Sequence, residues 1–167
     1  MMFKQSTGDL SVLTPEMALR EPVLYRLVKA PRFLDSYVLP HLEEAGRAED
    51  WYVAYRNDDG SYSLQAFVWP PGTRTQIHDH SSWGAFCCVV GSVVEERARL
   101  KKLWRLEWKM EDGISTVLPY EKGMHRVGNP NGEPAISVHL YGPRLGNIDG
   151  RDYDPSQNYV CDRPEDR

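Results

Sequence analysis

The chain has 167 residues, of which 41% are hydrophobic and 26% are charged, and its formal net charge is -4 at pH 7. This length and composition fit one globular domain with a sizeable core. The acidic balance argues against a nucleic-acid-binding protein, which normally carries a basic excess. The first residues show no basic region followed by an apolar run, and no stretch approaches the roughly 18 apolar residues of a membrane span. We therefore expect a cytoplasmic protein without nucleic-acid or membrane partners.

Three cysteines are present, at positions 87, 88 and 161. An odd number without regular spacing argues against a disulfide framework and favours a reducing compartment. Free cysteine is usually buried, so we expect Cys87 and Cys88 to be core residues.

The sequence pattern from residue 15 to residue 45 is typical of helices. A helical stretch starts at Pro31, with apolar residues at helical spacing. Pro40 lacks an N–H donor and should break or kink this helix, and Gly46 suits its end. We expect residues 1–50 to form a helical cap.

From Trp51 onward the pattern changes to short strands separated by turns. The strand-like runs are SYSLQAFVW, GAFCCVV, LWRLEWKM, ISTVLP and AISVHLYG, and the turn signals are NDDG, PPG, EDG and GNPNG. Many short strands with regular turns favour a β-sandwich or barrel. We expect a mainly β domain spanning 1–167, with its barrel at 51–143 and an irregular, polar C-terminal extension at 144–167.

Four of the five histidines fall in the β region. His78 and His80 are two residues apart, so on a strand both rings point to one face while Asp79 points to the other. Such a pair could bind one metal ion. A bare pair is also consistent with two polar residues on a solvated strand face.

The residues around this pair follow a longer pattern. The first group is Gly72, His78, His80 and Gly91, and the second is Gly113, Pro119, Gly123, His125 and Asn129. The two groups resemble the two motifs of the cupin superfamily over residues 72–129, with the internal glycine of the second motif displaced to Gly123. This resemblance implies a double-stranded β-helix, or jelly-roll barrel, and makes His125 the third metal ligand.

The sequence departs from the cupin pattern at one ligand position. The glutamate that usually completes the cupin site would fall at 84, which is glycine here. The remaining donors are three neutral imidazoles, from His78, His80 and His125. Such a site leaves coordination positions open and suits an anionic substrate such as a thiolate, which is a soft donor.

A second polar pattern lies in SVHLYGP. Ser137, His139 and Tyr141 occupy alternate positions, so a strand places them on one face. Burying such a row is expensive unless its groups are hydrogen-bonded. From the pattern alone, an equally good interpretation is a solvated face with Val138 and Leu140 inside.

Together with HDH and a third histidine, this row resembles the cysteine dioxygenase family of thiol dioxygenases. The resemblance implies Fe(II) as cofactor, and oxidation of a small thiol, cysteine or a mercapto-carboxylate, to its sulfinate with O2. It also implies that the hydroxyl of Tyr141 lies over the metal, with His139 and Ser137 behind it. Animal members crosslink this tyrosine to a cysteine. The matching position here is Gly84, so no crosslink is expected.

The same family anchors the substrate carboxylate with an arginine or glutamine one strand before HDH. Our register places Trp51 or Tyr52 there, and we take Tyr52 as the candidate, because Arg56 lies too close to the turn unless the strand is shifted. Arg126 and Arg144 are further candidate cations for substrate binding. Ordinary surface arginines are the alternative for both.

Two other functions remain open at this level. Three histidines also describe a catalytic zinc site of a hydrolase or isomerase. A cupin without redox chemistry could instead bind a small acid. A homodimer is possible, since cupins are often dimeric.

Overall fold

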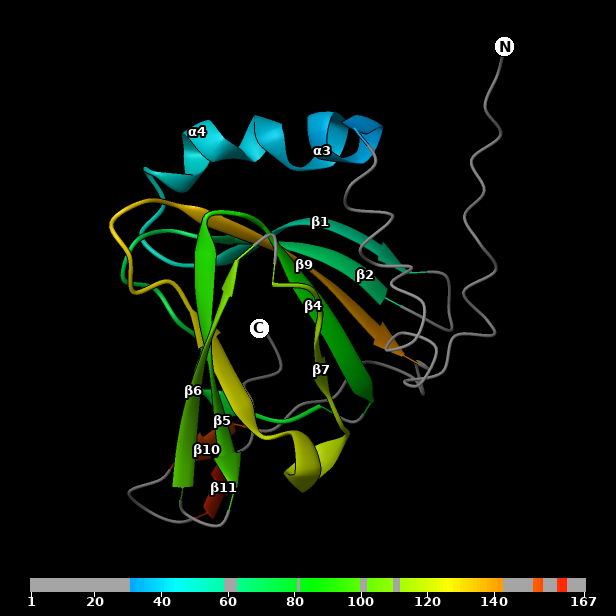
Figure 1. Cartoon of the computed structure of the whole chain (residues 1–167), viewed down its shortest axis with the longest axis vertical. Coiled ribbons are helices and arrows are strands. Elements are labelled where there is room, and N and C mark those ends of the chain that lie inside the picture. The colour runs from blue at the N-terminus through cyan, green and yellow to red at the C-terminus, as the bar shows by residue number, and fades with distance from the viewer. Residues whose placement is uncertain are drawn as a thin grey trace.

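Two antiparallel sheets face each other across the interior of the protein (Figure 1). The computed structural model describes residues 31–58, 63–80, 82–99, 102–109, 112–142, 152–154 and 159–161. The first sheet has the strand order β1-β2-β9-β4-β7, and the second has the order β11-β10-β3-β8-β5-β6. This arrangement confirms the predicted mainly β, double-stranded β-helix fold.

The strand bounds are β1 (Tyr52–Asp58), β2 (Ser63–Trp69), β3 (Ile77–His78), β4 (Trp83–Val90), β5 (Ser92–Arg99), β6 (Lys102–Lys109), β7 (Ser115–Val117), β8 (His125–Gly128), β9 (Ala135–Gly142), β10 (Asp152–Asp154) and β11 (Tyr159–Cys161). A short 3-10 helix (Tyr120–Gly123) precedes β8. Between β4 and β5 the chain turns at Gly91, whose φ of +67° is in the left-handed region. A side chain there would also approach the carbonyl oxygen of Pro134 to 2.9 Å, so the turn requires glycine.

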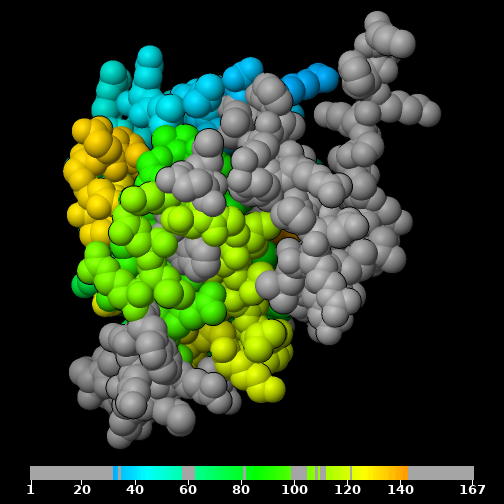
Figure 2. Space-filling view, in the orientation of Figure 1, coloured from blue at the N-terminus to red at the C-terminus, as the bar shows by residue number. Residues whose placement is uncertain are grey.

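The helical segment consists of α3 (Pro31–Tyr37), a 3-10 helix (Leu39–His41) and α4 (Leu42–Ala45). As predicted, the α-helix is interrupted around Pro40, which cannot donate a helical hydrogen bond. In the space-filling view this segment forms a layer along one side of the barrel (Figure 2). The helix expected before residue 31 lies outside the described residues.

The first sheet is buried on both of its faces. Its outer face carries Leu64, Val138 and Leu140, which pack against Phe33 and Val38 of the helical segment. Its inner face contributes a second apolar cluster between the two sheets, formed by Phe67, Trp69, Phe86, Cys88, Val93, Val127, Ala135 and Tyr141. The helical segment therefore removes from water a sheet face that would otherwise be solvated.

Cys87 and Cys88 are core residues, as predicted, and each is 1% exposed. They point to opposite faces of β4, Cys87 into the outer cluster and Cys88 into the inner one. Burial, followed by the neighbouring Cys88, raises the pKa of the Cys87 thiol to about 12. At neutral pH it is therefore protonated and a poor nucleophile.

The second sheet continues into the predicted C-terminal extension. Strand β10 pairs with β3, placing Asp152 opposite His78, and β11 pairs with β10. The expectation of an irregular extension at 144–167 is therefore wrong for these two strands. Strand β3 is only two residues long, and β10 gives it a second neighbour besides β8. Among the described helices, none is long and apolar enough to cross a lipid bilayer.

Candidate metal centre

Three buried histidines converge between the two sheets. His78 is the last residue of β3 and His125 the first of β8, and they lie opposite each other where these two strands pair. His80 follows two residues after His78. One ring nitrogen from each lies within 4.8 Å of the other two. The Nε2 atoms of His80 and His125 are 3.2 Å apart.

This geometry fits a transition metal. Two ligand nitrogens bound to one ion at about 2.0–2.1 Å, and about 90–110° apart, are separated by about 3–3.4 Å. The Nδ1 atom of His78 lies 2.9 Å from the carbonyl oxygen of Gln76, which can only accept, so Nδ1 carries the proton. The Nε2 lone pair of His78 is then available to an ion.

His125 is held in the same way by a carboxylate. Its Nδ1 lies 2.9 Å from Oε1 of Glu95, an interaction that places the proton on Nδ1 and the lone pair on Nε2. The residues present therefore suit a divalent metal bound through three neutral imidazoles.

The Ser137–His139–Tyr141 row lies on the inner face of β9 and forms one hydrogen-bonded chain. Ser137 Oγ is 2.7 Å from His139 Nε2, and His139 Nδ1 is 3.1 Å from the Tyr141 hydroxyl. The alternative of a solvated face is wrong, because all three side chains are buried. The ring of Tyr141 is 4.9 Å from that of His80, so the row ends beside the three histidines.

Trp69 extends this chain by one residue, which the sequence analysis did not identify. Its indole Nε1–H donates to Ser137 Oγ over 2.7 Å. Since an indole N–H can only donate, it fixes Ser137 as an acceptor at this contact. A tryptophan facing inward on the neighbouring strand is the only sequence signal, and it is typical of ordinary core residues as well.

His139 is neutral at neutral pH. Its ring lies between the rings of Phe67 and Phe86, with centroid distances of 4.4 and 4.8 Å. Burial lowers the pKa of His139 well below its ordinary 6.5, and the electrostatic effect of nearby His125 would lower it further. One ring nitrogen therefore donates and the other accepts, as a relay between two hydroxyl groups requires.

A cavity of about 200 Å³ opens beside the three histidines and Tyr141. Its wall consists of Trp51, Val53, Arg56, Gln65, Phe67, Trp69, Thr75, His78, His80, His125, Val127, His139 and Tyr141. Arg56 brings the only positively charged side chain among these residues. Tyr52 does not line the cavity; it packs against the cluster on the outer face of the first sheet.

A β-bulge explains why Arg56 rather than Tyr52 faces the cavity. Val53 pairs with Phe67, but the next pair is Tyr55 with Ala66, which leaves Ala54 as an extra residue in β1. Past the bulge, Arg56 is opposite the inward-facing Gln65. In a regular strand Arg56 would share a face with Tyr52. Of the two residues that the sequence register placed at the substrate position, Trp51 lines the cavity and Tyr52 does not, and the register left out Arg56.

Arg126, a further predicted substrate contact, is not among the residues that line this cavity. The Arg126 side chain points to the outer face of the second sheet, where its Nε pairs with Glu96. Arg144 lies outside the described residues. The role predicted for Arg126 is therefore unsupported by its position.

Glu95 is the second residue that sequence analysis missed. It faces inward from β5, is fully buried, and contacts His125, Ser115 and Arg97. Burial would raise the pKa of Glu95, but His125, Arg97 and Ser115 outweigh it and lower the pKa below its ordinary 4.5. A signal existed: in SVVEERAR, Glu95 shares the inward face with Val93.

A two-sheet barrel with three convergent histidines defines this protein as a cupin with a metal site. The family model of cysteine dioxygenase type I matches residues 50–155, more than half of the sequence, and the chain belongs to this family.

Similar proteins agree with this assignment. The chain is 26% identical to cysteine dioxygenase type 1 of Rattus norvegicus over 93 residues, which are 51% of this chain and 46% of that protein. It is 29% identical to the Danio rerio protein of the same name over 94 residues, which are 51% of this chain and 47% of that protein. The chain thus spans about half the length of the curated relatives it matches.

Solved structures share the fold at low identity. A point mutant of Bacillus subtilis oxalate decarboxylase is 15% identical and has a TM-score of 0.51. The match covers 63% of this chain and 28% of that chain. This likeness shows the fold alone. A Klebsiella pneumoniae protein with a double-stranded β-helix domain is 16% identical with a TM-score of 0.49, and 73% of this chain covers 95% of it.

Proposed function

We propose that the protein is an Fe(II)-dependent thiol dioxygenase that converts a small thiol and O2 into the sulfinate. The reaction balances without another reactant, because one thiol and one dioxygen molecule give one sulfinic acid. One observation carries the proposal: Tyr141, the last residue of the hydrogen-bonded Ser137–His139–Tyr141 row, lies beside three convergent histidines in one cavity. Membership of the cysteine dioxygenase type I family supports it.

His78, His80 and His125 would hold the ion through their Nε2 atoms. Ferrous iron in this position supplies the redox chemistry by which dioxygen reacts with a thiolate sulfur. Three neutral ligands leave the positive charge of the ion uncompensated, which favours an anionic thiolate over the neutral thiol. The absence of the usual cupin glutamate thus suits the proposed substrate.

Tyr141 would present a hydroxyl hydrogen to the substrate. Trp69 donates to Ser137, and when Ser137 in turn donates to His139 Nε2, the ring proton of His139 is on Nδ1. That N–H donates to the Tyr141 oxygen, and the tyrosine hydroxyl hydrogen is left pointing toward the cavity. The four residues form a one-directional chain of donors.

Arg56 would bind a carboxylate on the substrate. It is the cation among the cavity-lining residues, and arginine pairs with carboxylates through two parallel hydrogen bonds. Trp51 and Phe67, whose stacked rings are 5.7 Å apart, form an apolar wall beside it. The substrate class that fits is a small mercapto-carboxylate such as cysteine or 3-mercaptopropionate.

Oxygen consumption by the iron-loaded protein tests the proposal. Protein loaded anaerobically with Fe(II) is mixed with cysteine, 3-mercaptopropionate, cysteamine or mercaptosuccinate in aerated buffer. We expect oxygen uptake with at least one thiol, and mass spectrometry after reaction under labelled O2 should find both labelled atoms in the sulfinate.

Two controls make this experiment decisive. Zinc-loaded protein should be inactive, and His78→Ala should lose both metal and activity. If the iron form is inert toward every thiol, the dioxygenase proposal is wrong; activity restored by zinc with another substrate would favour a hydrolase or isomerase.

Two expectations from the sequence stay predictions. Size-exclusion chromatography with light scattering tests the possible homodimer, and cell fractionation tests the cytoplasmic location.

A further inference from the structure

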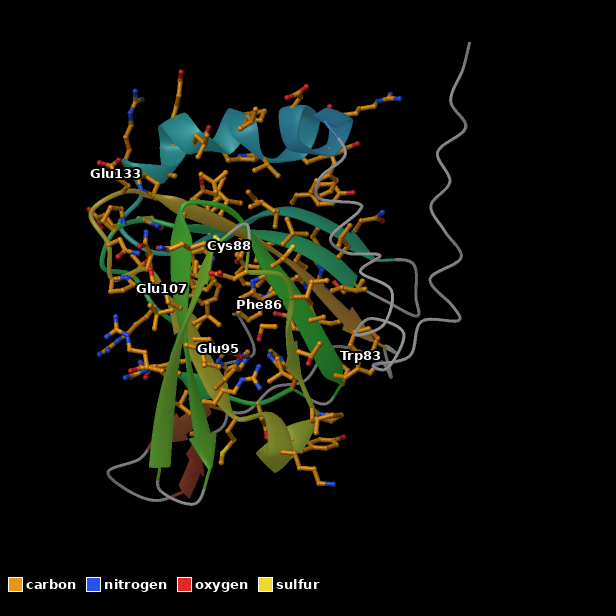
Figure 3. The ribbon with its side chains drawn as sticks, in the orientation of Figure 1. Trp83, Phe86, Cys88, Glu95, Glu107 and Glu133 are labelled. Atoms are coloured by element: carbon orange, nitrogen blue, oxygen red, sulfur yellow. The ribbon has the colours of Figure 1, made fainter. Side chains whose placement is uncertain are left out.

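Glu95 places a carboxylate directly behind one of the three histidines. It lies on β5 between the sheets (Figure 3), and its strand pairs with β8, which carries His125. Oε1 accepts from His125 Nδ1 over 2.9 Å, and Oε2 accepts from Ser115 Oγ over 2.7 Å. Arg97 also donates to Oε2, over 3.2 Å.

The carboxylate is held in this position from both ends. The NH2 group of Arg97 also donates to Ser115 Oγ and to the carbonyl oxygen of Thr116, each over 2.9 Å. Arg97, Ser115 and Glu95 thus form a closed set of contacts that leaves Oε1 for His125. Rotation of Glu95 away from His125 would break the contacts to Ser115 and Arg97 together.

Stability alone does not account for a charged group here. Removing a carboxylate from water costs several kcal/mol, and apolar residues of similar volume often replace buried ion pairs without loss. The inner cluster already contains Val93 on the same face of β5. Among the contacts of this carboxylate, the one with His125 links it to the metal ligands, because the opposite nitrogen of His125 faces the other two histidines.

His78 and His125 differ in what lies behind them. His78 donates to a neutral backbone carbonyl, that of Gln76, whereas His125 donates to an ionised carboxylate. A carboxylate partner fixes the tautomer and ring orientation and makes the imidazole a stronger electron donor. His125 is therefore expected to be a strong metal donor.

We propose that Glu95 is a positioning residue for the metal, which sets metal affinity by holding and polarising His125, with Ser115 and Arg97 fixing the carboxylate. The inference rests on the three-histidine metal site of the proposed function, but not on the identity of the thiol or on thiol oxidation itself.

The test compares Glu95→Gln with Glu96→Gln. The two residues are adjacent on β5, but Glu96 faces outward and pairs with Arg126. In Glu95→Gln, the amide NH2 must face either Arg97 or His125. Facing Arg97, it meets another donor. Facing His125, it needs Nδ1 as an acceptor, which puts the ring proton on Nε2, the nitrogen that should bind the metal. We expect Zn(II) and Co(II) affinities of Glu95→Gln to fall about 10- to 100-fold, as for other residues behind metal ligands. Glu96→Gln should match the parent protein.

Chelator competition gives the affinities, and thermal melting of the metal-free proteins checks that each variant is folded. The visible absorption of the Co(II)-saturated protein should shift in Glu95→Gln but not in Glu96→Gln, a change that a purely structural role would not cause. Unchanged affinity and an unchanged spectrum in folded Glu95→Gln would overturn the inference.

Ser115→Ala keeps the test decisive if Glu95→Gln does not fold. This variant retains the charge but loosens the carboxylate, so affinity should fall less than in a variant lacking the charge; unaltered affinity would contradict the proposed role. Affinities for Zn(II) and Co(II) are measured without thiol or dioxygen. A protein that loses affinity on substitution of Glu95 but oxidises no thiol would refute the proposed activity and leave this inference intact.

Discussion

Gly84 lies directly opposite Tyr141 in the β4–β9 pair, and a Cβ atom at position 84 would come within 3.1 Å of the tyrosine ring. In this protein the ring of Tyr141 occupies the space above the glycine, so its position depends on packing and on its hydrogen bond to His139.

Gly84→Ala should therefore disturb Tyr141 without affecting the metal ligands. The ring must move by a few tenths of an ångström, which disturbs the contact of its hydroxyl with His139. We expect turnover to fall several-fold with metal content unchanged, measured by oxygen uptake and metal analysis. Gly132→Ala is the matched control, because nothing lies within 4 Å of a Cβ at that position. Equal turnover in both variants would contradict the importance of this packing.

Trp69→Phe should weaken the relay at its first donor. The phenyl ring retains the packing against Phe67, but Ser137 loses the N–H that fixes it as an acceptor. Ser137 is then free to accept from His139, which reverses the polarity of the chain and takes the tyrosine hydrogen away from the cavity. We expect a roughly tenfold lower turnover number, about 1.4 kcal/mol, with substrate KM nearly unchanged. An unaltered turnover number in the folded variant would show that Trp69 serves packing alone.

Arg56→Ala should discriminate between thiols with and without a carboxylate. Loss of the guanidinium should raise the KM for 3-mercaptopropionate at least tenfold, because a charge-assisted pair is worth about 1.5–3 kcal/mol, while oxidation of cysteamine should change little. Steady-state oxygen uptake measures both. Arg126→Ala serves as the control, since Arg126 points to the outer face of the barrel. A greater effect of Arg126→Ala on 3-mercaptopropionate would reverse the assignment.

Acid should destabilise the protein partly through His139. The folded state holds the pKa of His139 well below 6.5, so below about pH 6.5 the unfolded chain takes up a proton that the folded protein excludes. The stability that depends on neutral His139 is complete above pH 6.5 and is lost as pH falls, by up to about 1.4 kcal/mol per pH unit.

His139→Gln removes this titration, so the free energy of unfolding of this variant should fall less steeply with decreasing pH than that of the parent protein. Urea unfolding of the metal-free proteins between about pH 7.5 and 5 gives the two slopes. Parallel slopes would mean that His139 does not contribute to the pH dependence.

Much of the centre could be predicted from spacing alone. The two-residue repeat of a strand unites Ser137, His139 and Tyr141 on one face of β9. His78 and His80 converge as expected, although β3 ends at His78. Pro40 predicted a broken helix because it lacks an amide hydrogen, and the structure shows that break. These inferences succeed because they depend only on local backbone geometry.

Other features required distant parts of the chain. The alternation in β9 does not say which face is inside, because the helical segment covers Val138 while the second sheet covers His139. A single extra residue, Ala54, turns Arg56 toward the cavity, and nothing in the local sequence specifies that bulge.

The sequence by itself determined which donors could share a strand face, since that depends on a fixed backbone period. Only the tertiary structure decided which face became the interior, and that Glu95 and Trp69 would stand behind His125 and Ser137. Those pairings join residues 30 and 68 positions apart, and such contacts arise from sheet pairing and burial rather than from local spacing.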